Sequence, residues 1–415
     1  MSASTSVNMQ TGMRSDISVK LCVFLLKNLG IWMCETTLEQ YGRNLMIALT
    51  YIFLTVATIF QIRDLYFTWI NDSDILYNIT NSLSLWIGTV KVSIVLLHKV
   101  EFLNLIVYMR EKFWTADYDA HEKNIVDKCR RTCIFFICCV TTVGMCVMAL
   151  YIITPFLSQS QNNDTERRLP FNMWIKPLLM TPFYECMIVS QILILYYVGL
   201  CYFCFDNVFC LMAVHLAGQF RIVRYRLETL CDIDYYSHVD EKNPEQQLLR
   251  TVDRIYSKFK QCVRQHQALI NFYESLQNVY TMIILVQVLM FSLLICLFGY
   301  QILLSPHATL GTRSIFALLV VGALSLLLMF TYSCDEVIEK SESIALGAYS
   351  AMWSILPMSQ PGRLLRKDLI TVIVRARRVC CLTANGFFPV SLETYTSILS
   401  TAASYFTLMR SNAEG

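Results

Sequence analysis

The chain has 415 residues, of which 55% are hydrophobic and only 16% are charged, whereas soluble domains carry about 25% charged residues. This shortage of charge excludes an ordinary soluble protein and indicates a membrane protein. The formal net charge of +3 gives no sign of a nucleic-acid partner. No cleavable signal peptide is expected, because Lys27 interrupts the first short apolar patch and no small-residue cleavage pattern follows it.

Seven segments are apolar enough to cross a bilayer, which takes about 20 residues per helix. In chain order they are residues 44–62, 75–97, 132–163, 186–205, 275–312, 314–334 and 392–409. The second contains Lys91 near its end, where a long side chain can snorkel to the headgroups. An all-α membrane protein with seven transmembrane helices is therefore predicted, and an odd number of spans places the termini on opposite sides.

The basic residues predict a cytoplasmic N-terminus and an extracellular C-terminus. With this orientation, 27 of the 34 Lys and Arg residues fall in inner segments and 6 in outer segments, with Lys91 as the remaining one, in agreement with the positive-inside rule. Three glycosylation sequons begin at Asn71, Asn78 and Asn163, in or beside the first two outer loops. We expect glycans at Asn71 and Asn163, whereas Asn78 lies too close to the membrane.

The 17 cysteines do not indicate a metal or redox site, because most lie in apolar runs where a thiol behaves as a small hydrophobic group. Cys201 and Cys204 have the spacing of half a zinc site but lack a second pair and a nearby histidine, so packing is expected. No catalytic motif, cofactor or metal is predicted. Asp206, deep in an apolar run, either has a function or marks where the fourth helix leaves the lipid.

Residues 335–391 combine charge with an apolar helical pattern, which indicates helices packed on protein. One helix is expected to end at Pro357, and a second to follow the turn at residues 359–362 and run through Val374. The motifs are Ser343-x-Ala345-x-x-Ala348-Tyr349-x-x-x-Trp353, then Leu382-x-Ala384-x-Gly386-x-Phe388, then a last helix ending Ser404-Tyr405-Phe406-Thr407-Leu408. In these motifs the chain closely resembles the insect odorant receptor family.

The resemblance implies an odorant-gated, non-selective cation channel that is built as a tetramer in the plasma membrane of a sensory neuron. It implies a ligand-binding bundle with cytoplasmic loops at residues 1–334, anchor helices at 335–391 and a pore-lining span with a short outer tail at 392–415. Tyr349 and Trp353 are expected to pack in the anchor. Because its second cytoplasmic loop is short, the chain resembles an odorant-tuning subunit that forms a heterotetramer with the shared co-receptor.

One face of the last helix has the character of a pore lining. At 100° per residue, five side chains fall within about 40° of one direction: Ser397, Thr401, Ser404, Leu408 and Ser411. Hydroxyls can line water, and one bulky apolar ring can close a narrow path by dewetting. The family's hydrophobic gate matches Leu408. The alternative interpretation is that the hydroxyls allow close helix packing.

The odorant site of the family lies in the outer half of the bundle, between the second and sixth spans. The residues expected there are Tyr77, Leu83, Trp86, Met145, Met148, Ile152, Tyr184, Met187, Ile188, Gln191, Phe298, Phe316 and Val320. Such a pocket would suit a small, mostly apolar volatile, held by packing and one hydrogen bond from Tyr or Gln. For each residue, core packing or lipid contact is the alternative.

Two other functions stay open at this stage. A gustatory-type receptor has the same fold, although the ending Ser404-Tyr405-Phe406 favours the odorant type. A G-protein-coupled receptor would place the N-terminus outside and carry signatures that the chain lacks, and a transporter would carry paired intramembrane charges or inverted repeats.

Overall fold

The structure is a computed structural model that describes residues 17–32, 36–71, 75–161, 183–231, 244–303, 310–351, 353 and 358–414. Over these ranges the chain is helical, and the only β-pairing is one isolated bridge between Thr383 and Pro389. The helices are α2 (Ile17–Asn28), α3 (Thr37–Asn71), α4 (Ile75–Leu97), α5 (Lys99–Tyr108), the π-helical turn η1 (Met109–Phe113), α6 (Ala120–Gln161), α7 (Phe183–Glu228), α9 (Pro244–Leu303), α10 (Leu310–Ser350), α11 (Gln360–Ala376) and α12 (Leu392–Glu414). The predicted all-α class is confirmed.

Six of the described helices, α3, α4, α6, α7, α9 and α10, are long and apolar enough to cross a membrane. Each contains all or most of one predicted span: the bounds of α4 coincide with those predicted, whereas the spans predicted at 132–163 and 275–312 run past the ends of α6 and α9. The seventh predicted span is α12, whose many hydroxyl residues make it less apolar than the other six. With 60 residues, α9 is about 90 Å long, three times the thickness of the hydrocarbon core, so most of it extends into water.

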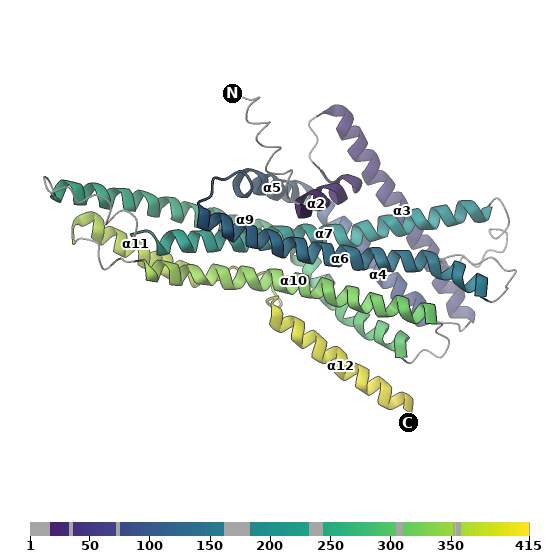
Figure 1. Cartoon of the computed structure of the whole chain (residues 1–415). Coiled ribbons are helices and arrows are strands. Elements are labelled where there is room, and N and C mark those ends of the chain that lie inside the picture. Colours follow the sequence, from purple (N-terminus) through teal and green to yellow (C-terminus); the bar gives the residue numbers. More distant parts are fainter. Residues whose placement is uncertain are drawn as a thin grey trace.

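The long helices α6, α7, α9 and α10 run along the molecule, α3 and α4 lie at one end, and α12 contacts α9 and α10 but diverges from the long helices at an angle (Figure 1). The central helix is α7, which packs against α2, α3, α4, α6, α9 and α10. Residues 204–220 of α7 are all buried, as expected of a helix that is apolar on every side. Because lipid tails are as apolar as leucine, van der Waals packing stabilises these contacts within the membrane.

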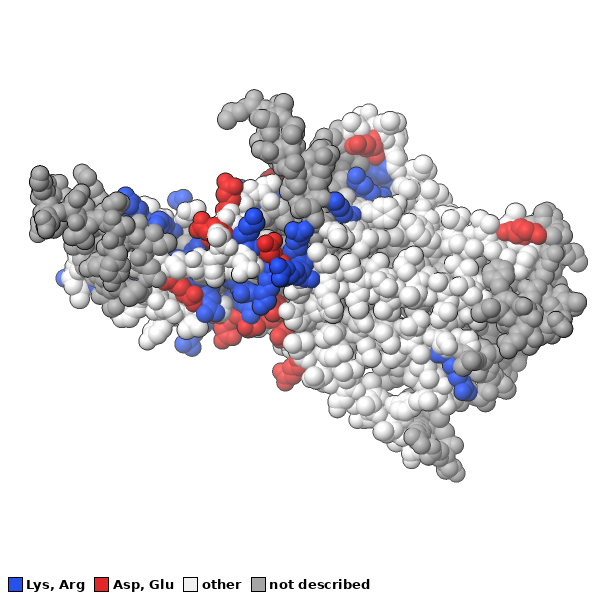
Figure 2. Space-filling view, in the orientation of Figure 1, with Lys and Arg blue, Asp and Glu red and all other residues white. Residues whose placement is uncertain are grey.

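Charged side chains are concentrated at one end of the molecule, and a broad apolar surface covers the other part (Figure 2). The charged end contains α11 together with the last turns of α7 and α10 and the first turns of α9 (Figure 1). This division follows from the sequence, since the uncharged runs form the membrane part of each helix and the charged runs form its extension. The boundary between residues 334 and 335 therefore lies inside the continuous helix α10.

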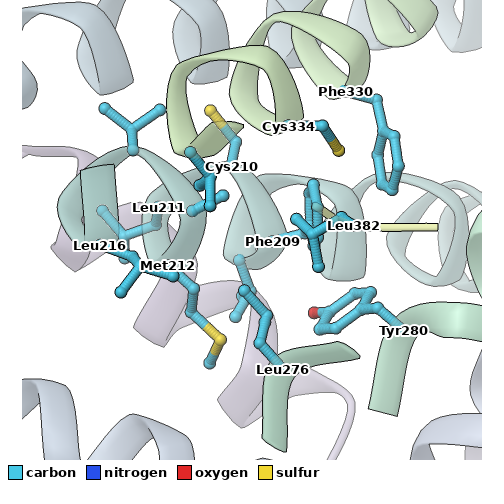
Figure 3. Packing of buried hydrophobic residues seen from close by; sticks show 14 of the residues in the cluster. Phe209, Cys210, Leu211, Met212, Leu216, Leu276, Tyr280, Phe330, Cys334 and Leu382 are labelled. Carbon is cyan, nitrogen blue, oxygen red and sulfur yellow. The ribbon is translucent and has the colours of Figure 1, made fainter. Parts of the chain in front are cut away.

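An aromatic core joins the membrane part to the charged part (Figure 3). Phe209 of α7 stacks on Phe330 of α10, with ring centroids 4.1 Å apart, and lies 4.8 Å from the ring of Tyr280 in α9. Leu382, from the segment between α11 and α12, is fully buried in the same cluster. The segment that precedes α12 is thereby packed into the same cluster as α7, α9 and α10.

The prediction for the end of α10 was wrong. Its helix ends at Ser350 rather than at Pro357. The carbonyl oxygen of Trp353 does not continue the helix and instead accepts a hydrogen bond of 3.3 Å from Arg366 of α11. The next helix begins at Gln360, so that residues predicted as a turn form the first turn of α11, with proline in a position that helix starts favour.

Candidate functional site

The membrane part of the bundle encloses a cavity of about 170 Å³. It lies between six helices, α3, α4, α6, α7, α9 and α10. It is lined by Ala57, Phe60, Gln61, Asp64, Asn81, Ser84, Leu85, Val143, Gly144, Val147, Met148, Tyr151, Gln191, Ile194, Leu195, Val198, Gly199, Tyr202, Phe203, Phe298, Leu319, Gly322, Ala323 and Leu326. Most of these side chains are apolar, with a few polar groups converging from different helices, which is the usual character of a small-molecule site.

The polar groups of the cavity come mainly from α3, α4, α6 and α7. The Tyr151 hydroxyl donates a 2.9 Å hydrogen bond to Oδ1 of Asn81, and Gln191 is 99% buried, with 1% of its surface exposed. These groups lie on the inner faces of α4, α6 and α7. A polar guest that enters the cavity must keep such buried groups hydrogen-bonded, because leaving one of them unsatisfied costs about 1–3 kcal/mol.

Two glycines of the cavity wall make room for it. A Cβ at Gly199 would lie 2.7 Å from the thioether sulfur of Met148, and a Cβ at Gly144 would lie 2.3 Å from the ring of Phe203. Both neighbours line the cavity. The volume therefore depends on the absence of side chains at these two positions, and any larger residue there pushes Met148 or Phe203 toward the cavity.

The structure brings three of the predicted ligand residues to the cavity: Met148, Gln191 and Phe298. Trp86 and Met145 instead have about half of their surface exposed on the outside of the bundle. The others are half-buried or buried but do not line the cavity: Tyr77, Leu83, Ile152, Tyr184, Met187, Ile188, Phe316 and Val320. Of these, Phe316 is fully buried and packs edge to face on Tyr77, with centroids 5.6 Å apart.

The helical period explains these differences. In α7 the cavity face is Gln191, Ile194, Leu195, Val198, Gly199 and Tyr202, a regular stripe at i, i+3, i+4, i+7, i+8 and i+11. Extending the stripe from Gln191 would have identified Tyr202, and extending it from Met148 would have identified Tyr151. The residues of α6 that line the cavity are Val143, Gly144, Val147, Met148 and Tyr151, and Met145 and Ile152 are not among them. The contribution of α3 was missed because the first span was not considered.

A buried ion pair lies beside the cavity. Nζ of Lys91 in α4 is 2.7 Å from Oδ2 of Asp206 in α7, and both side chains are at most 1% exposed. Gln287 of α9 donates to the same carboxylate oxygen at 3.2 Å, and the ammonium group lies 4.8 Å from the ring centroid of Tyr202. The pair thus joins three spans directly next to a residue of the cavity wall.

The prediction that Lys91 snorkels to the headgroups was wrong. The side chain points into the protein because Asp206 provides a carboxylate there, and burying one charge without the other is costly. Asp206 is fully buried and paired with Lys91, and α7 continues as a helix for 22 residues beyond it. One paired intramembrane charge, expected of transporters, is therefore present.

The predicted pore face of α12 is exposed in the single chain. Ser397, Thr401, Ser404, Leu408 and Ser411 all face away from the bundle, and Leu408 is 58% exposed. The opposite face packs on α9 and α10 through Ile398 and Ala402, both of which are buried. The side chain of Arg410 lies outside the described part of the chain.

The hydroxyl groups of this face are arranged regularly. The hydroxyls of Thr401 and Ser404 donate to the carbonyl oxygens of Ser397 and Ser400, at 2.8 and 2.9 Å. This back-bonding uses the hydroxyl hydrogens, so that the lone pairs of the oxygens point outward. Such a face can accept hydrogen bonds from water or coordinate a passing cation weakly.

A short hairpin connects the anchor helices to α12. It turns at Asn385 and Gly386, which have φ angles of 50° and 78°, the left-handed conformation that Asn-Gly turns require. Gln277 of α9 holds it by accepting from the Thr383 amide at 3.0 Å and donating to the Thr383 carbonyl at 3.0 Å. Burial raises the pKa of the Cys380 thiol to about 11, so this thiol stays protonated and unreactive at neutral pH.

The predicted anchor residues and glycosylation sites have different positions. Tyr349 and Trp353 are 66% and 42% exposed at the charged end, so they do not pack in the core of their own subunit. Asn71 ends helix α3, but its side chain and the whole of Asn163 lie outside the described residues. Among the residues that the structure describes, no cluster of ligands suited to a metal ion occurs.

The fold and the cavity together define a class of protein: a multi-pass helical membrane receptor with an internal site for a small ligand. The family model described as the 7tm odorant receptor matches residues 73–403, most of the chain. The chain therefore belongs to the insect odorant receptor family, as its C-terminal motifs predicted. It is a multi-pass plasma-membrane protein, and the family is one of receptors rather than enzymes.

Relatives and solved structures agree with this assignment. The chain is 23% identical to odorant receptor 13a of Drosophila melanogaster over 94% of both chains, and 22% identical to odorant receptor Or2 of Anopheles gambiae over 94% of this chain and 98% of that one. The fold is that of olfactory receptor OR5 from Machilis hrabei in complex with eugenol, with a TM-score of 0.76 at 14% identity, covering 94% of this chain and 98% of the other.

Proposed function

We propose that this odorant receptor is a tuning subunit of an odorant-gated, non-selective cation channel. It binds a small volatile compound in the cavity of the membrane bundle and opens a central pore lined by α12. The observation that carries the proposal is the mostly apolar cavity between the helices, which brings together side chains of six helices. A guest that contacts all six helices can change their relative positions, which is what a ligand-gated channel requires.

The size of the cavity limits the ligand. An apolar cavity of about 150 Å³ holds one benzene molecule, and the cavity here is about 170 Å³. We therefore expect a compound of about the size of a single ring, with one polar group at most. Tyr151 or Gln191 supplies the hydrogen bond, and Met148 and Phe298 supply packing. The solved receptor of the same fold carries eugenol, which supports the binding of a small organic compound by this fold.

The pore is proposed to run along the hydroxyl face of α12. The five residues of this face are exposed in the single chain, and the helix packs on its own subunit through Ile398 and Ala402 instead. In a tetramer, four such faces surround a common axis. Leu408 is the one bulky apolar side chain among hydroxyls, so that a ring of such residues closes the path by excluding water.

The partner in this assembly is the family co-receptor. The charged end of the chain exposes several large apolar side chains that water does not favour: Leu346, Tyr349, Trp353, Leu364, Ile370 and Val374. A patch of this kind on a cytoplasmic domain indicates a protein interface. Packing these side chains between subunits of a heterotetramer, through helices α10 and α11, gives the anchor its function and leaves α12 free to line the pore.

The orientation is proposed with the N-terminus in the cytoplasm. Figure 2 shows basic and acidic side chains gathered at the end that this orientation places inside. Replacing Ser73 or Thr165 by Ala removes a sequon from a proposed outer loop and should abolish a mobility shift on deglycosylation. A sequon engineered into residues 98–131 should stay unmodified, and a glycan found there would reverse the orientation.

Expression with and without the co-receptor tests the function. With the co-receptor, a panel of single-ring volatiles should evoke a cation current in at least one case, and Tyr151→Phe should shift the dose-response curve. A hydrogen bond from the Tyr151 hydroxyl to the ligand is worth about 1 kcal/mol, so its loss should lower the potency roughly fivefold. Signalling through G proteins without any current would overturn the proposal.

A further inference from the structure

A second, polar cavity of about 340 Å³ opens between α6, α7 and α10, away from the ligand cavity. Its wall contains four basic side chains, Lys128, Arg221, Arg224 and Lys340, and two acidic ones, Glu228 and Glu336. With the histidine of the wall neutral, two positive charges are in excess. No part of the proposed odorant mechanism uses these residues.

The acidic residues are already paired within the cavity. Arg224 donates to Glu228 at 2.8 Å, and Glu336 lies 3.9 Å from Lys340 and accepts from Tyr332 at 3.1 Å. In the described part of the chain, no carboxylate lies within 4.0 Å of Lys128 or Arg221. The excess charge therefore belongs to these two residues, one from α6 and one from α7.

The cavity lies at the boundary between the apolar surface and the charged end. On α6 the uncharged run starts at Thr132, on α7 an uncharged run ends just before Arg221, and on α10 an uncharged run ends at Cys334. All three borders are within about one helical turn of residues in the cavity wall. The charged atoms over α6 and α10 in Figure 2 form a band beside the apolar surface. A headgroup of the adjacent lipid leaflet can reach a cavity at this level.

We infer that this cavity binds the phosphorylated headgroup of an anionic phospholipid from the cytoplasmic leaflet. The guanidinium group of Arg221 can bind two phosphate oxygens at once, and Lys128 adds a point charge from the neighbouring helix. Basic pockets between transmembrane helices on the cytoplasmic side suit such headgroups, because that leaflet carries the anionic lipids. The inference rests on the proposed orientation, which the glycosylation test examines independently.

A bound headgroup would link three helices at their exit from the membrane. Lys128 is on α6 and Arg221 is on α7, while the paired Lys340 and Glu336 are on α10, which leads directly to the anchor. Several phosphate oxygens can engage these residues together, so a headgroup with more than one phosphate group is preferred over one with a single phosphodiester. The lipid then acts as a fixed part of the assembled receptor.

Vesicle binding by the full-length chain, purified in the complex that it forms on expression, tests the inference. Vesicles of phosphatidylcholine contain either phosphatidylserine or phosphatidylinositol 4,5-bisphosphate, at equal total charge. The wild type should prefer the bisphosphate, and Lys128→Gln with Arg221→Gln should lower that affinity on the order of tenfold or more. Arg221→Lys, which keeps the charge but loses the planar guanidinium group, should lower the affinity for the bisphosphate vesicles by less.

The matched control is Lys367→Gln with Arg377→Gln, which removes the same charge from exposed positions on and just after α11. An equal loss of binding in this control, or no preference for the bisphosphate, would show general surface attraction and overturn the inference. Soluble inositol trisphosphate should compete only weakly. If it binds as tightly as the vesicles, the site is one for a free phosphate compound and the lipid assignment is wrong. Unchanged elution and melting of the variants exclude misfolding.

Discussion

Removal of Lys91 leaves the Asp206 carboxylate alone inside the membrane bundle. At 2.7 Å the attraction between the two charges is about 6 kcal/mol at an effective dielectric constant of about 20. Desolvation of each ion costs several kcal/mol, so the intact pair contributes little net stability. Loss of one partner exposes the desolvation cost of the other, and Lys91→Met should lower the free energy of unfolding by about 3–5 kcal/mol.

The two single variants should differ. Asp206→Asn leaves the ammonium group beside the rings of Tyr202 and Phe291, at 4.8 and 5.8 Å from their centroids, where cation–π attraction is worth about 2 kcal/mol in a desolvated site. Lys91→Met leaves the carboxylate with one side-chain hydrogen bond among the described residues, from Gln287. The lysine variant should therefore be the less stable one, and the double variant Lys91→Met with Asp206→Leu should recover most of the loss.

Thermal melting of the detergent-solubilised receptor, followed by size-exclusion chromatography, measures these differences. A loss of 3–5 kcal/mol corresponds to a fall in Tm of roughly 3–6 °C in a chain of this size. Lys112→Met removes an exposed lysine and should change the Tm by little. If Lys91→Met has the same Tm as the wild type and reaches the cell surface normally, the ion pair does not exist as described.

Three further changes follow from the cavity, the pore helix and the anchor. Leu408→Ser should raise ligand-independent current several-fold in the heteromer because a hydrophobic closure is weakened. Ala402→Ser, about 140° from the centre of the pore face, should not raise it. Equal currents in the two variants would show that α12 does not line the pore. Gly199→Ala should push the neighbouring thioether into the cavity and weaken the response to ring-sized ligands about tenfold, measured as a shift of the dose-response curve. Smaller ligands should keep their potency, and a uniform shift for all ligands would contradict this prediction. Tyr349→Ala and Trp353→Ala should reduce the amount of tetramer on a native gel by weakening a subunit interface. The melting temperature of the single subunit should stay unchanged because both side chains are exposed. Intact tetramers would show that these residues lie outside the subunit interface.

The membrane spans could be predicted because they depend on local composition. Charged residues mark the ends of an apolar run, and residues 75–97 were bounded correctly because Asp74 and Lys99 flank them, although the run contains Lys91. The extensions of α7, α9 and α10 beyond the membrane carry charge, so their helices look like loops to a search for apolar runs. Their stability comes from packing against each other at the charged end, which no single segment reveals.

The ion pair and the cavity could not be predicted with the same certainty because they depend on contacts between distant residues. Lys91 and Asp206 are 115 residues apart in the sequence, and only the packing of α4 on α7 shows that they meet. For the cavity, Gln191 was identified because it lies in the zone where the resembling family binds its ligand. Met145 and Trp86 were misplaced because the rotation of a helix about its axis depends on its neighbours.

Current in a membrane patch isolated from the cytoplasm tests the central proposal most directly. The receptor and its co-receptor are expressed together, and an inside-out patch is perfused without nucleotides while a single-ring volatile that activates the whole cell is applied. A channel that contains its own ligand cavity should still open, with a shift in potency when Tyr151→Phe is present. A response that disappears when nucleotides are removed would contradict the proposal that this chain is a subunit of the channel that the ligand opens. An equal potency in the wild type and in Tyr151→Phe would contradict it as well.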